Sequence, residues 1–101
     1  MKKLKWKGFE VLTILKMKQD TEEASRKGYI YTIPIEHMDL AVIWDLIQQF
    51  RKLGIQFAMN DIYPAFKSKE ELDRALLRVY NSGWKERWRI EDYLRKEGLI
   101  P

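Results

Sequence analysis

With 101 residues, no cysteine and 46% hydrophobic residues, the chain is long enough to bury one core but not a core and a separate catalytic lobe. The absence of cysteine excludes disulfides, thiolate metal sites and cysteine nucleophiles. The net charge is +4, but residues 1–18 carry six lysines against Glu10 alone, so this segment is +5 and the remainder is −1. We therefore predict a single domain over residues 1–101 with a strongly basic N-terminal end.

The first eight residues are predicted to form a basic arm around Trp6. Excess positive charge attracts polyanions, and an arm of this kind can enter a DNA groove or contact phosphates. Lysines near a terminus can also serve solubility alone, so both interpretations stay open. The arm's cations are Lys2, Lys3, Lys5 and Lys7.

The next segment, residues 9–35, is predicted to contain a short pair of strands. Phe9–Met17 and Tyr29–Ile33 are rich in β-branched and aromatic residues, which favours strands, although a helix over 9–17 stays open. Between them, Asp20–Glu23 is expected to open a short exposed helix. Glu10 and Lys16 interrupt the apolar run at 9–17, so neither a membrane span nor a secretory signal is predicted, and a cytoplasmic protein is expected.

Two amphipathic helices are predicted in the middle of the chain. Apolar residues recur at helical spacing over Asp39–Leu53 and cover most of the circumference, which indicates a central helix packed on several sides. Ser68 with Glu71 forms a capping box ahead of a helix over 69–82. Glycine followed by an apolar residue marks the predicted helix ends at Gly28, Gly54, Gly83 and Gly98.

Residues 55–84 have the pattern of a helix-turn-helix. Asn60 or Asp61 is predicted to cap a short helix through Phe66, with Pro64 in its first turn and Lys67 and Ser68 as the turn. A further helix is predicted over Arg87–Glu97. Because tryptophans that follow a glycine cap are usually buried, Trp84 and Trp88 are predicted to lie in the core, with base stacking or backbone clamping as the alternative.

The core over residues 39–84 resembles winged helix-turn-helix domains. The residues that carry the resemblance are Gly54-Ile55-Gln56-Phe57, Asn60-Asp61-Ile62 and the stretch from Leu76 to Trp84. The resemblance implies a mainly α fold, with α+β as the open alternative, and double-stranded DNA binding by a dimer in transcriptional control. In place of the family's hairpin wing, residues 85–101 show another helical pattern.

The candidate DNA-binding residues lie on the predicted helix 69–82 and just before it. Arginine pairs with guanine edges and asparagine with adenine, while lysines at the turn meet phosphates. The residues are Arg74, Arg78 and Asn81 for bases and Lys67 and Lys69 for phosphates, together with the N-terminal lysines. Glu70, Glu71 and Asp73 oppose this prediction because carboxylates repel phosphate, and a solvated face with intrahelical ion pairs is the alternative.

A protein-interaction module, either a homodimer or an adaptor that inhibits a larger machine, is the second function that the sequence permits. It would use aromatic residues such as Tyr31, Tyr63, Trp84 and Trp88. Catalysis is not predicted, because His37 is the only histidine and the chain has neither a phosphate-binding glycine loop nor a nucleophile elbow. No metal, cofactor or small-molecule substrate is expected.

Overall fold

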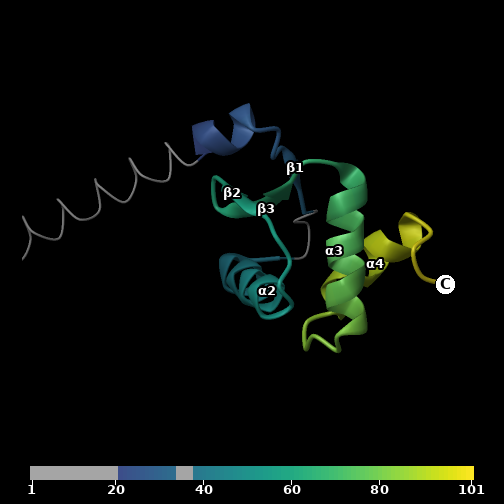
Figure 1. Ribbon diagram of the computed structural model, residues 1–101. Helices are drawn as coiled ribbons and strands as arrows, with labels where there is room; N and C mark the ends of the chain where they lie inside the picture. Colours follow the sequence, from purple (N-terminus) through teal and green to yellow (C-terminus); the bar gives the residue numbers. More distant parts are fainter. Residues whose placement is uncertain (1–20, 34–37) are drawn as a thin grey trace, which may run out of the picture.

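The computed structural model describes residues 21–33 and 38–101, and Figure 1 shows how their elements are arranged. Residues 21–26 are helical. Six labelled elements follow: β1 (Tyr31–Thr32), α2 (Leu40–Lys52), β2 (Ala58–Asn60), β3 (Tyr63–Phe66), α3 (Lys69–Asn81) and α4 (Trp88–Lys96). Within these residues the fold therefore combines helices with one small sheet.

Local residues define both ends of helix α2. The Asp39 carboxylate accepts a hydrogen bond from the Val42 N–H at 3.0 Å, which satisfies one of the free donors of the first turn. Arg51 and Lys52 lie in the last turn, where cations suit the negative end of the helix dipole. Gly54 follows with a positive φ of 70°, which permits the chain to turn away from the helix.

The three strands form an antiparallel sheet in the order β1-β3-β2. β2 and β3 are a hairpin whose last pair is Asn60 with Tyr63, so Asp61 and Ile62 form the loop. β1 pairs with Phe66 and Ala65 and stops before Pro64, which has no N–H to donate to a neighbouring strand.

Helices α3 and α4 pack against each other on the other side of the molecule. The Ser68 hydroxyl accepts from the Glu71 N–H at 3.1 Å, as the capping box predicts. The Tyr80 hydroxyl donates to Glu91 at 3.0 Å and joins α3 to α4. In Figure 1, α3 stands between α2 and the sheet on one side and α4 on the other.

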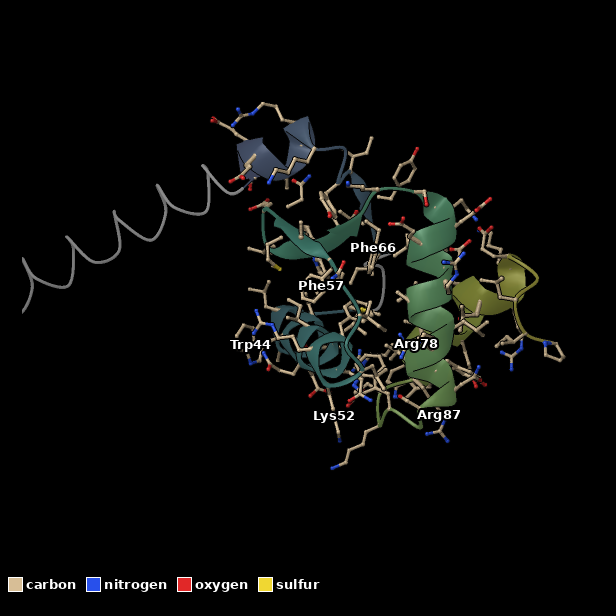
Figure 2. The ribbon with its side chains drawn as sticks, viewed as in Figure 1. Trp44, Lys52, Phe57, Phe66, Arg78 and Arg87 are labelled. Atoms are coloured by element: carbon tan, nitrogen blue, oxygen red, sulfur yellow. The ribbon has the colours of Figure 1, made fainter. Side chains whose placement is uncertain are left out.

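One hydrophobic core connects these elements. It combines buried residues from α2, β3, α3 and α4, and Phe50 of α2 lies 5.6 Å from both Phe57 and Phe66, measured between ring centroids. Figure 2 shows Phe57 and Phe66 above α2, on the side of the sheet. Trp84 belongs to this core and is only 5% exposed.

Several predictions from the sequence are confirmed. The helices expected over 39–53, 69–82 and 87–97 are present as α2, α3 and α4, and residues 21–26 form the short helix expected after Asp20. The four glycines predicted to end helices all have a positive φ. The coarse expectation of a mixed or mainly helical fold is therefore confirmed.

The short helix predicted to begin at Asn60 or Asp61 is wrong. Residues 58–66 form the β2–β3 hairpin, because a two-residue loop at Asp61 and Ile62 reverses the chain and the strands bury Ala65 and Phe66. A helix-turn-helix over 55–84 is therefore not formed. The predicted partner strand of 29–33, residues 9–17, lies outside the described residues, as does His37; within them, β1 pairs with β3 instead.

Two predictions about burial are also wrong. Trp88 is 56% exposed, unlike its neighbour Trp84, because Ile90 and Leu94 supply the buried face of α4. α2 is not packed on several sides, since Leu40 and Trp44 are 63% and 60% exposed. The outer face of α2 thus exposes two large apolar side chains among its polar residues.

Candidate nucleic-acid interface

The structure places the three predicted base-reading residues on the exposed surface of α3, but their surroundings differ. Arg74, Arg78 and Asn81 are all exposed. The Arg78 guanidinium donates to the Leu53 carbonyl oxygen at 3.0 Å, at the C-terminal end of α2. Arg78 therefore contacts the end of a second helix, an arrangement that the sequence pattern did not predict.

The two lysines predicted to meet phosphates have partners within the fold. The Lys69 ammonium group lies 2.9 Å from Asp73 and 2.6 Å from Glu97, and its hydrogen bonds to these carboxylates, above all to Glu97, raise its pKa. The Lys67 ammonium group lies 5.3 Å from the ring centroid of Tyr29. The N-terminal lysines Lys2, Lys3, Lys5 and Lys7 lie outside the described residues.

The N-terminal end of α3 is acidic. Glu70 and Glu71 are exposed there, and the Lys69 charge is matched by two carboxylates. A helix that reads a DNA groove presents its N-terminal residues to the nucleic acid. Phosphates would meet negative charge at this end, so the docking mode expected from the sequence is not supported by the charges on α3.

Exposed cations lie from the middle of α3 to its C-terminal end and on the elements beside that end. We define the basic face as five exposed cations from α2, α3 and the turn between α3 and α4: Lys52, Arg74, Arg78, Lys85 and Arg87. Figure 2 shows Lys52 and Arg87 at the lower end of the molecule, with Arg78 above them on α3. The C-terminal ends of α2 and α3 meet here, so both helix dipoles direct their negative ends toward these cations.

Two hydrogen bonds fix the elements that carry the basic face. The Gln49 amide donates to the Ser82 hydroxyl at 2.9 Å and joins α2 to the end of α3. The buried Trp84 indole N–H donates to the Asp45 carboxylate at 2.8 Å and joins the turn to α2. The cations are thus presented by a packed junction and not by a loop alone.

Two carboxylates near the basic face have partners within the fold. Asp45 accepts from Trp84, and Glu86 forms an ion pair with Arg89 at 2.8 Å. Among the described residues, none of the five cations of the basic face forms an ion pair with a carboxylate. No described carboxylate therefore neutralises these five charges, while Arg78 and Arg87 also donate hydrogen bonds to the carbonyl oxygens of Leu53 and Trp84, respectively.

A shallow hollow of about 270 Å³ lies within the basic face. Arg74 and Arg78 line it from α3, and residues 54–56 line it from the connector after α2. Glu71, one turn before Arg74 on α3, also lines the hollow and places a negative charge beside Arg74. Two guanidinium groups on one side of a hollow suit the oxygens of a phosphate backbone.

Trp88 adds an exposed aromatic ring at the start of α4. The Arg89 guanidinium lies 4.4 Å from the centroid of its ring, a cation–π contact. Exposed aromatic rings beside cations are typical of surfaces on which unpaired bases stack. Burial is confirmed for Trp84 and wrong for Trp88, and base stacking on the exposed Trp88 stays a prediction.

A second surface is apolar. A groove of about 380 Å³ lies between α2 and the β2–β3 hairpin. We call it the apolar groove; its lining residues are Leu40, Ile43, Trp44, Ile47, Arg51, Met59, Asp61 and Ile62. Figure 2 shows Trp44 on the outer side of α2, away from α3. The sequence-based list of exposed aromatics did not include this residue.

Sequence reasoning missed three cations of the basic face, namely Lys52, Lys85 and Arg87. None of the three is among the candidate DNA-binding residues that the sequence predicts. The signal that could have predicted them is the presence of cations close to Gly54 and Gly83, the glycines that end α2 and α3. Cations are favourable near the C-terminal ends of helices, so two such ends that lie together bring their cations close to each other.

Other classes of site have no support in the described part of the chain. No group of three or more His, Cys, Asp or Glu side chains there could hold a metal ion. In the same residues, no helix has the length and apolar character required to cross a membrane.

Comparisons with known proteins identify no relative. No protein-family model, curated protein or solved structure matches the chain. The functional argument therefore depends on the two surfaces themselves.

Proposed function

We propose that this protein binds DNA through the basic face. The observation that carries the proposal is a set of five exposed cations on α2, α3 and the turn after α3, none of them paired with a carboxylate of the described residues. DNA binding was predicted from the sequence, but the surface proposed here includes the C-terminal end of α3 in place of its N-terminal end. The contacts are to phosphates, so affinity depends more on charge than on base sequence.

The N-terminal lysines would add to this attraction. Lys2, Lys3, Lys5 and Lys7 carry four of the positive charges of the +5 segment, and basic arms supplement the main contact in many DNA-binding domains. A role in transcriptional control, which the winged-helix resemblance implies, stays a prediction.

The salt dependence of affinity tests the proposal. Binding of a short labelled duplex is measured by fluorescence anisotropy over a salt series, for the unmodified chain and for Arg74→Ala and Lys85→Ala. Each cation that neutralises a phosphate contributes about 0.9 to the slope of log K against log salt concentration. Each variant should therefore bind more weakly and lower this slope by about one.

Lys96→Ala is the matched control. Lys96 is an exposed cation in the last turn of α4, next to Glu97, whose carboxylate binds Lys69 at the acidic end of α3. Its removal changes the net charge by the same amount as Lys85→Ala, but it should leave the slope unchanged. Absence of binding at low salt, or equal weakening by Lys96→Ala and Lys85→Ala, would reject the basic face as the interface.

A second candidate function, protein interaction, is favoured by the apolar groove. Leu40 and Trp44 expose large side chains on its rim, and apolar surface of this kind gains free energy, about 25 cal/mol per Å², when a protein segment covers it. Substituting Trp44→Ser should abolish such an interaction and leave DNA binding intact. Sedimentation velocity and the duplex assay on the same variant separate the two functions.

A further inference from the structure

The exposed ring of Trp88 directly follows Arg87, a cation of the basic face. Its side chain is 56% exposed, although a tryptophan ring is among the largest apolar groups that a core can bury. Helix α4 packs into the core through Ile90 and Leu94 instead. The ring is therefore left at the surface, in a position where tryptophan commonly contacts a ligand.

Two neighbouring side chains hold this ring in place. The Arg89 guanidinium carbon lies 4.4 Å from the centroid of the Trp88 ring, and the Arg89 Nε donates to the Glu86 carboxylate at 2.8 Å. The cation thus covers one face of the ring, so the exposed part of the ring includes its opposite face. A ring that is already held loses less conformational entropy when a planar ligand stacks on it.

Two cations of the basic face lie close to the ring along the chain. Lys85 and Arg87 are exposed, and neither forms an ion pair with a described carboxylate. The Cα atom of Lys85 is three Cα–Cα steps from that of Trp88, so the two atoms are no more than about 11 Å apart. A base stacked on the ring would therefore have nearby phosphates within reach of both cations.

The charge on the other side of the ring has the opposite sign. Asp92 is exposed on α4, one turn after Trp88 and on the same side of the helix. Its carboxylate repels phosphates, so a bound strand would place its backbone on the side of Lys85 and Arg87.

From the open face of the ring, its fixed orientation and the adjacent cations, we infer that Trp88 stacks an unpaired base and that this site takes single-stranded DNA. The inference rests on the proposed function, because the phosphate contacts are those of the basic face. In a duplex each base is stacked between its neighbours, which leaves no face open to the ring. Every base has a π-face, so the stacking accepts any base sequence.

Parallel binding measurements on a single strand and a duplex test this inference. The probes are a labelled thymidine strand of about 12 nucleotides and a duplex of the same length, measured by fluorescence anisotropy at one salt concentration. Trp88→Ala should weaken binding of the single strand by about 5- to 100-fold, the usual loss of one stacked base, and should change duplex affinity by less than about twofold. The matched control is Trp44→Ala, which removes a tryptophan of similar exposure from the apolar groove and should change neither affinity.

The salt dependence of single-strand binding separates stacking from charge. The indole ring neutralises no phosphate, so Trp88→Ala should lower the affinity without changing the slope of log K against log salt concentration. Lys85→Ala should lower this slope by about 0.7, the contribution of one phosphate contact to a single strand.

The duplex affinity of each variant reports whether its basic face is still folded. Equal weakening of the single strand and the duplex by Trp88→Ala would mean that the ring supports the fold and stacks no base. Unchanged single-strand affinity in Trp88→Ala would also overturn the inference. In both cases, duplex binding that depends on Arg74 and Lys85 would leave the proposed function intact, whereas binding of neither probe at low salt would reject both.

Discussion

The hydrogen bond between Trp84 and Asp45 joins the turn after α3, which carries part of the basic face, to α2. Trp84 is buried, and its indole N–H has the Asp45 carboxylate as acceptor at 2.8 Å. Replacing Asp45 with leucine leaves this donor unsatisfied, which should lower the free energy of unfolding by about 1–3 kcal/mol. Urea denaturation of the unmodified chain and of Asp45→Leu measures the loss.

Asp45→Asn is the control for this prediction, because its amide oxygen can still accept from the indole. Its loss should be clearly smaller than that of Asp45→Leu. Equal losses would show that the hydrogen bond is not what stabilises the junction of α2 with the turn after α3.

Tyr93 gives the fold a dependence on alkaline pH. Burial, and the hydrogen bond that its hydroxyl donates to Asp73, raise the pKa of Tyr93 to about 12. In the unfolded chain a tyrosine has a pKa of about 10. Because the folded state holds the proton more tightly, the stabilising contribution is fully present below about pH 10 and is lost as the pH rises toward about 12.

The Tyr93→Phe variant lacks this contribution, so below about pH 10 it should be less stable than the unmodified chain. This difference in unfolding free energy should shrink as the pH rises toward about 12. The difference in unfolding free energy between the two, measured in urea at pH 9 and at pH 11, should be smaller at pH 11. Tyr31→Phe is the control, since the Tyr31 side chain is exposed on β1. A difference for Tyr93→Phe that does not change between pH 9 and pH 11 would contradict the prediction.

The candidate site could be predicted from the sequence only in part, and single residues show why. Helical spacing correctly placed Arg74, Arg78 and Asn81 on the exposed face of α3. It could not predict that Arg78 meets Leu53 or that Lys69 meets Glu97, because these partners are 25 and 28 residues away along the chain. The availability of a cation for a ligand depends on such distant partners.

At the level of elements, the β2–β3 hairpin depends on the backbone conformation of Asp61. Asp61 is the only described residue other than glycine with a positive φ, at 61°. For residues with a Cβ atom, this left-handed conformation costs about 1–2 kcal/mol, less for aspartate and asparagine. Asp61→Gly should therefore keep or raise the stability of the chain, whereas Asp61→Val should lower it by about 1–2 kcal/mol.

Thermal unfolding followed by circular dichroism tests the role of Asp61, with Ile62→Val as the control at the neighbouring loop position. The backbone N–H that binds Thr21 is retained in every variant, so side-chain and backbone effects stay separate. A stable Asp61→Val variant would contradict the prediction.

The helices were predictable from the sequence because their signals are local. Ser68 with Glu71, the apolar spacing of α2 and the glycines after each helix all act within a few residues. The hairpin was not predicted because its signals also suit a helix start: Asn60 and Asp61 are common caps, and Pro64 is common in a first helical turn. Pairing with β1, more than 30 residues earlier in the chain, helps decide for the sheet.

At the scale of the whole molecule, a single core holds together two surfaces of different character. The basic face lies at the junction of α2, α3 and the turn before α4, while the apolar groove lies between α2 and the hairpin. Helix α2 contributes to both, with Lys52 on the basic face and Leu40 and Trp44 on the groove. Damage to the packing of α2 should therefore affect both surfaces together.

Phe50 is one of the five buried residues through which α2 packs into the core. Its side chain is fully buried, and its ring contacts Phe57 in the connector and Phe66 in β3. Phe50→Ala should lower the free energy of unfolding by about 3–5 kcal/mol because it removes these contacts and leaves a cavity. Phe50→Leu keeps most of the volume and should cost less.

Because α2, β3, α3 and α4 share one core, the destabilised variant should still unfold in one cooperative transition. Helical circular dichroism reports on α2, α3 and α4, and tryptophan fluorescence includes the buried Trp84 at the junction of α2 with the turn. In Phe50→Ala, both probes should shift to lower urea concentration by the same amount. Separate midpoints would mean that α3 and α4 form a unit independent of α2, and the two surfaces would then not be coupled through α2.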